Sequence, residues 1–168
     1  MDSYHEALKI LQNELIDRMR YLLDRANQSI VQLTDSQIWY RPHEKSNAIG
    51  NLILHIVGSL KLMILSGIAA LPDTRNRAAE FEARASIEKK YQMDLLRETV
   101  ESCCQVIIGF PFERISEKAN IQKSDMSICR VLIMAISHTS IHVGQIQYAT
   151  KMLLKDAYKE AANSVKNK

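Results

Sequence analysis

The sequence predicts an all-α fold, a four-helix bundle that occupies residues 1–168 as a single domain. A chain of 168 residues is long enough for one full hydrophobic core and too short for two comfortable ones. It contains only five glycines and three prolines, so few residues interrupt its helices. Apolar residues also recur every three or four positions in each long segment, which is the period of a helix with one buried face. We therefore expect four long helices and no sheet.

The first helix is expected from Ser3 to about Val31. Ser3 and Glu6 form the pattern of a capping box, in which two side chains satisfy free backbone groups of the first turn. The connection after this helix contains Pro42 and several polar residues, with room for one short helical turn. The apolar face of the helix is made by Leu8, Leu11, Leu15, Met19, Leu22, Ala26 and Ile30.

The second helix is expected from an N-cap at Asn47 to about Gly67. It is apolar on nearly all sides, as is typical of a helix packed in the middle of a bundle. The polar, arginine-containing stretch 71–85 follows, and it predicts either a mobile loop or a helical extension. Such a long connection between helices two and three allows the third helix to run parallel to the second.

The third helix is predicted to be capped by Ser86 and to end at the run Gly109-Phe110-Pro111. A loop then leads to the fourth helix, which is expected from Ser124 or Asp125 to about Leu154. These four segments account for nearly the whole chain, and no repeat or second domain is indicated.

Charge and hydropathy exclude several classes of protein. The net charge of +3 comes from basic residues interleaved with acidic ones, whereas a nucleic-acid-binding protein normally has a concentrated basic face. The N-terminal residues contain neither a basic start nor an apolar run, so no signal peptide is predicted. The longest apolar stretch, residues 52–65, is interrupted by polar residues and predicts a buried helix, not a membrane span. A cytoplasmic protein is expected.

Three cysteines, Cys103, Cys104 and Cys129, also fit a cytoplasmic protein. An odd number with two adjacent residues is not a disulfide framework. We expect these side chains to be small thiols that fill the core in a reducing compartment.

Two polar stripes on otherwise apolar helices suggest a metal site. His138 and His142 are four residues apart on the fourth helix, so their rings lie on one face, and Gln145 extends that face by a turn. The second helix has its own stripe, with Asn51, His55 and Ser59 at successive steps of four. Burying both stripes costs several kcal/mol unless they satisfy each other or hold a ligand. If they meet, His55, His138 and His142 form an open three-histidine metal site.

Other interpretations of the histidines remain open at this point. A pair of histidines four apart on a helix binds metal in only a minority of cases, and His55 alone is more typical of a hydrogen-bonded core residue. Thr139 stands where a zinc protease of the H-E-x-x-H type has glutamate, so that class is excluded. His5 and His43 lie in polar surroundings and are expected at the surface.

The order of several motifs resembles the DinB-like superfamily of four-helix bundles, over nearly the whole chain. The arginine-rich loop and the fourth-helix motif look most like a little-characterised bacterial branch of it. The motifs are W-x-R-P (Trp39, Arg41, Pro42), N-A-I-G-N-L-I-L-H (Asn47 to His55), R-N-R-x-x-E-F (Arg75, Arg77, Glu80, Phe81) and H-x-x-x-H-x-G-Q-I (His138, His142, Gly144, Gln145).

This resemblance implies a divalent metal ion bound by His55, His138 and His142. Zn²⁺ and Ni²⁺ are the expected ions, and iron and manganese also accept imidazole ligands. Some DinB-like relatives transfer bacillithiol, mycothiol or glutathione, others are described as metal-dependent hydrolases, and many form dimers. The resemblance therefore implies a homodimer whose small-molecule substrates include a low-molecular-weight thiol.

The sequence leads to two competing hypotheses about function. The first is a metal-dependent thiol S-transferase or related hydrolase, in which the ion activates a thiol or a water molecule. Arg41, Arg75 and Arg77 could then hold an anionic cosubstrate, unless they are solvated loop charges. The second is a non-catalytic metal-binding or stress-response structural protein. Asn51, Ser59 and Gln145 are candidates for hydrogen bonds to substrate or to the metal ligands.

Overall fold

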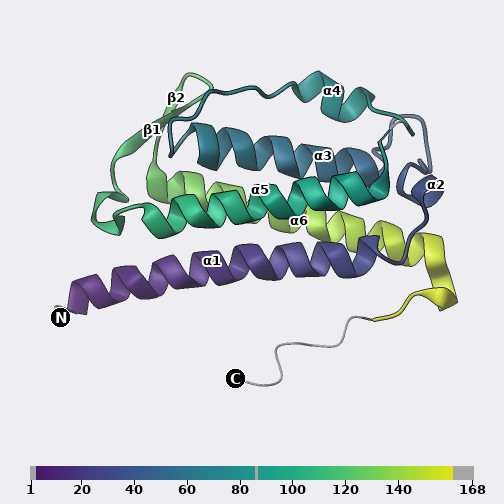
Figure 1. Ribbon diagram of the computed structural model, residues 1–168, viewed down its shortest axis with the longest axis horizontal. Coiled ribbons are helices and arrows are strands. Elements are labelled where there is room, and N and C mark those ends of the chain that lie inside the picture. The colour runs from purple at the N-terminus through teal and green to yellow at the C-terminus, as the bar shows by residue number, and fades with distance from the viewer. Residues whose placement is uncertain (1–2, 86, 161–168) are drawn as a thin grey trace.

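The computed structural model describes residues 3–85 and 87–160, and four long helices lie side by side along the long axis of this part of the chain (Figure 1). They are α1 (Ser3–Ile30), α3 (Ile49–Leu60), α5 (Lys89–Gly109) and α6 (Ile128–Leu154). The chain direction in Figure 1 shows that α1 and α6 run one way and α3 and α5 the other. The predicted four-helix bundle, with helices two and three parallel, is therefore confirmed.

Shorter elements connect these helices: α2 (Asp35–Ile38), α4 (Arg77–Glu82) and a 3₁₀ turn at Phe112–Arg114. A second 3₁₀ turn, Lys155–Ala157, follows α6. A β-hairpin precedes α6, with β1 (Lys118–Ile121) antiparallel to β2 (Ser124–Ser127). The expectation of no sheet is wrong for these residues, and the fourth helix begins at Ile128 instead of Ser124 or Asp125. The reason is local: the side chain of Ser127 accepts a hydrogen bond from the Arg130 N–H and caps the helix there.

The tip of the hairpin holds two non-glycine residues in the left-handed region, Gln122 (φ 49°) and Lys123 (φ 68°). A side chain in this conformation costs about 1–2 kcal/mol. Replacing Lys123 with glycine is therefore expected to raise the free energy of unfolding in urea by about 0.5–1 kcal/mol. The matched control is Lys118→Gly, which places glycine in the strand itself and is expected to lower stability. Equal effects of the two substitutions would contradict this interpretation of the turn.

Helix α3 lies at the centre of the core, as its all-round apolar character predicts. All of its residues except Leu54 are buried, and it packs against α5 on one side and α6 on another. It begins after an N-cap at Ala48, not Asn47, because the Asn51 side chain accepts a hydrogen bond from the Ala48 N–H at 3.1 Å. After Leu60 the helix widens into a π-helical segment, Lys61–Ser66.

One segment of the described chain, Ile49–Ser66, is long and apolar enough to cross a membrane, with a mean hydropathy of 1.7. Of this segment, 72% is buried inside the protein, because it forms α3 and the π-helical turn at the centre of the bundle. The burial identifies it as the core helix that the sequence predicts.

Part of the polar segment 71–85 forms a short helix that packs against α3. Helix α4 lies over α3 (Figure 1), and the amide of Asn51 donates hydrogen bonds to the carbonyls of Glu80 (2.8 Å) and Ala83 (3.1 Å). Arg41 donates to the Asn51 side chain at 2.6 Å and to the Phe81 carbonyl at 3.1 Å. The crossover between α3 and α5 is therefore fastened to the bundle by side chains from α3 and from the preceding loop.

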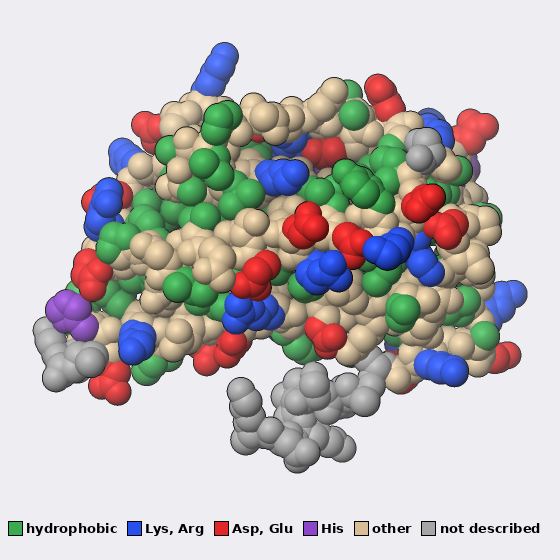
Figure 2. Space-filling view, in the orientation of Figure 1, with side chains coloured by type: hydrophobic (Ala, Val, Ile, Leu, Met, Phe, Trp, Pro, Cys, Tyr) green, Lys and Arg blue, Asp and Glu red, His purple; other side chains and the backbone are tan. Residues whose placement is uncertain are grey.

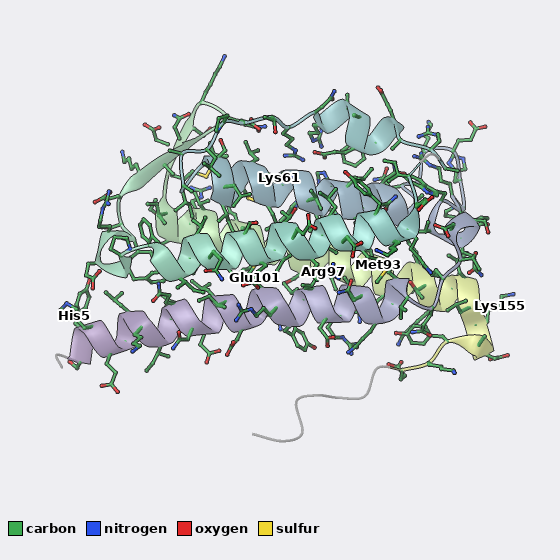
Figure 3. All side chains as sticks on the ribbon, in the orientation of Figure 1. His5, Lys61, Met93, Arg97, Glu101 and Lys155 are labelled. Carbon is green, nitrogen blue, oxygen red and sulfur yellow. The ribbon has the colours of Figure 1, made fainter. Side chains whose placement is uncertain are left out.

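The third long helix begins at Lys89 after an N-cap at Glu88, and the predicted cap, Ser86, lies outside the described residues. On the face in Figure 2, basic and acidic side chains are interleaved, as the sequence predicts. Figure 3 shows Glu101 on the α1 side of α5, where it accepts a hydrogen bond from Arg20 at 3.0 Å. Cys103 and Cys104 are buried free thiols that fill the core as predicted, and burial raises the pKa of Cys103 to about 12; Cys129 is a free thiol too, but it is only half-buried.

Candidate metal centre

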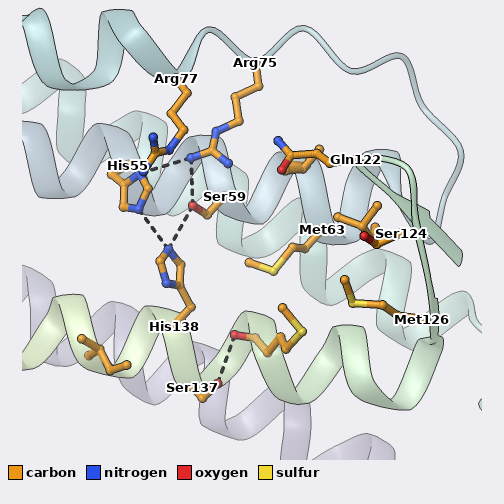
Figure 4. Close-up of a pocket in the computed structure, with 14 residues that line it drawn as sticks. His55, Ser59, Met63, Arg75, Arg77, Gln122, Ser124, Met126, Ser137 and His138 are labelled. Carbon is orange, nitrogen blue, oxygen red and sulfur yellow. Dashed lines mark hydrogen bonds between the residues drawn. The ribbon is translucent and has the colours of Figure 1, made fainter.

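Three histidines from two helices meet at one end of a cavity between α3 and α6. The ring centroid of His55 lies 4.9 Å from that of His138 and 4.8 Å from that of His142, and the two α6 rings are 4.4 Å apart. The Nε2 atoms of His55 and His138 are 3.1 Å apart, and Figure 4 shows these two rings facing each other. One nitrogen from each ring lies within 4.8 Å of the others, so the group could hold a metal ion. The three histidines lie together as predicted, whereas Asn51 of the same stripe does not reach the cluster.

Hydrogen bonds to the other ring nitrogens direct Nε2 of two histidines toward the centre. Nδ1 of His55 lies 2.8 Å from Oε2 of Glu80, and Nδ1 of His142 lies 2.8 Å from Oε1 of Gln145. Both oxygens are acceptors, so we assign the hydrogen to each Nδ1 and a lone pair to each Nε2; Nη2 of Arg75, a second neighbour of His55 Nδ1 at 3.1 Å, then donates to Glu80 instead. A carboxylate behind a ligand imidazole is the usual support of a histidine metal site.

Two observations indicate that the three histidines are suited to bind a metal ion. Nε2 of His142 is buried and has no hydrogen-bond partner among the described residues, and such an atom needs an explanation in a folded protein. The separation of 3.1 Å between the other two Nε2 atoms is also close to the spacing of about 3.3–3.4 Å between tetrahedral ligands at the usual zinc–imidazole distance. Three neutral imidazoles are a donor set that Zn²⁺, Ni²⁺ and other divalent transition metals accept.

A buried ion pair supports the cluster from the side of α4. Arg75 donates to Glu80 through Nε (2.6 Å to Oε1) and Nη2 (2.9 Å to Oε2), and the two side chains are only 9% and 7% exposed. Burial alone would raise the pKa of Glu80. The hydrogen bonds from Arg75 and His55 outweigh it, so the pKa lies below its ordinary value and the carboxylate is ionised. Nη2 of Arg75 also reaches Oγ of Ser59 at 3.2 Å, which joins the pair to the cavity wall.

The environment keeps two of the imidazoles neutral. Burial lowers the pKa of His55, and the hydrogen bond to Glu80 opposes this effect only in part. Burial, followed by the charges of the neighbouring histidines and of Arg75 and Arg77, lowers the pKa of His138 to about 4. A neutral imidazole is the form that binds metal, so these shifts favour metal binding at neutral pH.

The metal-free protein is expected to lose stability as the pH falls from about 6.5 toward 5. In this range the unfolded chain protonates His138 at its ordinary pKa of 6.5, whereas the folded protein does not. The unfolded state then binds more protons than the folded state. The contribution of His138 to the free energy of unfolding is therefore fully present above pH 6.5 and decreases as the pH falls below it. Glu80 contributes only below its ordinary pKa of 4.5, outside this range.

Urea unfolding between pH 7 and 5 in the presence of a chelator measures this dependence. The variant His138→Gln should show a shallower slope than the wild type, and the control His43→Gln, at an exposed loop residue, should keep the wild-type slope. An unchanged slope in His138→Gln would contradict the expectation.

The other predicted site residues fall into two groups. Ser59, Gln145, Arg75 and Arg77 lie at the cluster or its cavity: Ser59 Oγ is 3.1 Å from His138 Nε2, and Arg77 lines the cavity with its guanidinium 5.1 Å from the ring of Phe81. Arg41 and Asn51 are instead hydrogen-bonded to each other, and both donate to backbone carbonyls of the crossover between α3 and α5.

The sequence interpretation missed Glu80 as a site residue. It appears in the R-N-R-x-x-E-F motif, but a carboxylate in a polar loop gives no signal that it contacts a histidine 25 positions earlier. His5 and His43 are exposed, as predicted.

The cavity beside the histidines has a volume of about 500 Å³, which is in the range of small-molecule sites. Its polar end is formed by His55, His138, Ser59 and the two arginines, and the remainder is lined by side chains of the π-helical segment, the hairpin and α6 (Figure 4). The arrangement can therefore present a metal ion to a small molecule in the cavity.

Comparison with solved structures identifies the fold. A DinB-like protein from Bacillus cereus matches with a TM-score of 0.67 at 16% identity, over 83% of this chain and 90% of that one. A conserved protein from Enterococcus faecalis gives 0.69 at 18% identity, over 84% and 96% of the two chains. A DinB-like protein from Bacillus subtilis gives 0.66 at 14% identity, over 89% and 96%. No curated protein matches the sequence.

The resemblance to the DinB-like superfamily is thus confirmed for the fold. Residues 6–166 also match a family model described as "protein of unknown function (DUF1572)". The match spans nearly all of the four-helix bundle, including the crossover with Glu80 and all three histidines of the cluster. The chain therefore belongs to the DUF1572 family and has the fold of DinB-like proteins.

Proposed function

We propose that the protein is a divalent-metal-dependent enzyme that forms a bond from the sulfur of a low-molecular-weight thiol, or the oxygen of water, to a small electrophile, whose leaving group departs as the S–H or O–H proton passes to solvent. The observation that carries this proposal is a group of three histidine nitrogens within 4.8 Å of one another, two of whose rings, those of His55 and His138, line a cavity of about 500 Å³. Three protein ligands next to open space are typical of a catalytic metal site, whereas structural sites close with a fourth ligand. A metal bound here would supply Lewis acidity, which lowers the pKa of a thiol or water molecule.

Each side chain around the cluster has a separate part in this proposal. His55, His138 and His142 would hold the ion, while Glu80 and Gln145 fix the rings of His55 and His142 through their Nδ1 atoms. Ser59 lies on the cavity wall, between His138 and Arg75, and can hydrogen-bond to a bound substrate. Glu80 is committed to Arg75 and His55, so its role is to position the ring rather than to move a proton.

The alternative is a metal-binding protein without catalysis, in which the ion stabilises the bundle or serves a stress response. A fourth protein ligand would favour it. Among the described histidine, cysteine, aspartate and glutamate side chains, the group that meets here consists of the three histidines alone. This composition favours the enzyme, since it leaves coordination positions for a substrate.

Elemental analysis of untagged protein, followed by a thiol-conjugation screen, tests the proposal. We expect one equivalent of a divalent ion per chain, with zinc or nickel ahead of iron and manganese. Glutathione, bacillithiol and mycothiol are then offered with a chromogenic electrophile, with and without a chelator. Conjugation above the uncatalysed rate that disappears with chelator supports the transferase. Stoichiometric metal without turnover of thiols or of hydrolysable esters would favour the non-catalytic alternative.

We also propose a cytoplasmic homodimer that forms through α6. Apolar side chains on this helix recur at a spacing of seven or four and are 60% (Ile141), 69% (Tyr148) and 61% (Met152) exposed. Light scattering on a size-exclusion column should give twice the mass of 19.2 kDa. The variant Tyr148→Glu should be monomeric, and the control Ile10→Glu, at a 56% exposed residue of α1, should remain a dimer. A monomeric wild type would disprove this assembly.

A further inference from the structure

The cavity beside the histidines is cationic at one end, and the rest of its lining is largely apolar, with Gln122, Ser124 and Ser137 as its polar members. Figure 4 shows Arg75, Arg77 and His55 at one end, and Met126 with Ser124 and Gln122 at the hairpin end, with Met63 between them. The residues that line the cavity include two arginines and no carboxylate. A ligand that fits this distribution has a charged head and an apolar body.

The two arginines are not equivalent. The charge of Arg75 is compensated by the buried carboxylate of Glu80, to which it donates two hydrogen bonds. Arg77 has no carboxylate within ion-pair distance among the described residues, and its guanidinium packs over the ring of Phe81. With neutral histidines, Arg75, Arg77 and Glu80 sum to a net charge of about +1, and a divalent ion would raise this to about +3. Arg77 is therefore the side chain available to pair with an anion.

The apolar part of the cavity is rich in methionine. Met63, Met126 and Met134 come from three different elements, and Ile121 and Leu62 complete the wall. Methionine is unbranched and polarisable, so such a wall adapts to apolar chains of different shape. It gives affinity through burial of CH₂ groups without selecting one hydrogen-bonding pattern.

From this arrangement we infer that the cavity binds anionic amphiphiles, with the anionic head at Arg77 and the apolar chain along the methionines toward the hairpin. Under the proposed function, the anionic amphiphile is also the electrophile that reacts beside the histidines. Only this second role of the ligand rests on the proposed function. Binding itself requires no turnover.

Calorimetric titration with straight-chain carboxylates tests the inference. Butanoate, hexanoate and octanoate should bind with increasing affinity, by about fourfold for each added CH₂ group that is buried. Octanamide, which has the same chain without the charge, should bind about tenfold more weakly than octanoate. Equal affinities of octanoate and octanamide, or no dependence on chain length, would overturn the inference.

Two pairs of variants assign the two ends of the ligand. Arg77→Gln should weaken octanoate about tenfold, and Arg97→Gln, at an exposed arginine of α5, should leave the affinity unchanged. Met134→Gln, at a residue of the cavity wall, should flatten the dependence on chain length, and Ile10→Gln, at an exposed apolar residue of α1 outside the cavity, should not. An affinity for octanoate that is unaffected by Arg77→Gln would remove Arg77 as the head-group site.

Titrations of chelator-treated and zinc-loaded protein separate this inference from the proposed function. Octanoate binding that depends on Arg77 in the chelator-treated protein supports the inference even if no ion is found by elemental analysis. Binding that needs the ion and ignores Arg77→Gln would overturn it while leaving the metal site intact.

Discussion

Replacing His142 with alanine is expected to lower the affinity for Zn²⁺ by more than about 100-fold. Loss of a hydrogen-bonded partner behind a metal ligand already costs about 10–100-fold, and loss of the ligand itself costs more. The fold should persist, because alanine favours the helix and the substitution removes a buried nitrogen that has no hydrogen-bond partner among the described residues. Calorimetric titration of the metal-free protein with Zn²⁺ or Ni²⁺ measures the change.

Thermal unfolding gives an independent readout of the same substitution. At a concentration of free Zn²⁺ about 100 times the dissociation constant, binding stabilises the wild type by about 2.7 kcal/mol, whereas His142→Ala should gain almost nothing. The control is His43→Ala, at an exposed histidine outside the cluster, which should bind and respond as the wild type does. If His142→Ala bound zinc as tightly as the wild type, the three histidines would not be one ligand set.

Replacing Glu80 with alanine is expected to lower the free energy of unfolding by about 3 kcal/mol and the Zn²⁺ affinity by about 10–100-fold. The first effect arises because Arg75, whose side chain is 9% exposed, would keep a buried charge without its carboxylate. The second arises because His55 would lose the acceptor that orients its ring. Urea unfolding and calorimetry on the same variant measure both.

A double substitution separates these two effects. Arg75→Met combined with Glu80→Leu removes both charges, so it should recover most of the stability while the Zn²⁺ affinity stays low. Glu82→Ala, at an exposed carboxylate of the same short helix, is the matched control and should change stability by less than about 0.5 kcal/mol. If Glu80→Ala behaved like Glu82→Ala, the buried ion pair would have no part in holding the site.

The long helices and the histidine cluster were predictable because their signals are local and periodic. His138 and His142 share a helix face by spacing alone, and a lone polar stripe on the apolar α3 needed a partner. The hairpin was not predictable, since its turn is Gln122-Lys123, where a glycine at the second position would have indicated it. The π-helical widening after Leu60 likewise has no signature in composition or period.

The support of the cluster depends on contacts between residues far apart in the chain. Glu80 is 25 positions from His55, and the sequence places it in a polar segment that could equally have been a loop. Arg41 and Asn51 look like site residues because they are polar and lie near the histidines in sequence. In the structure both side chains donate hydrogen bonds to backbone carbonyls of the crossover. The partners lie 40 and 32 positions further along the chain, so no local pattern predicts them.

The crossover that carries α4 also bears on how quickly the site can exchange its contents. Helix α4 has only six residues and is held to α3 by the hydrogen bonds of Asn51 and of Glu80 with His55, and by Arg41 from the preceding loop, so we expect it to detach at a lower free energy than the bundle opens. Its detachment withdraws Glu80 from His55 and uncovers the cluster, while the four long helices keep their packing. If the cluster holds an ion as proposed, we expect exchange of that ion to follow the opening of this one short segment instead of global unfolding.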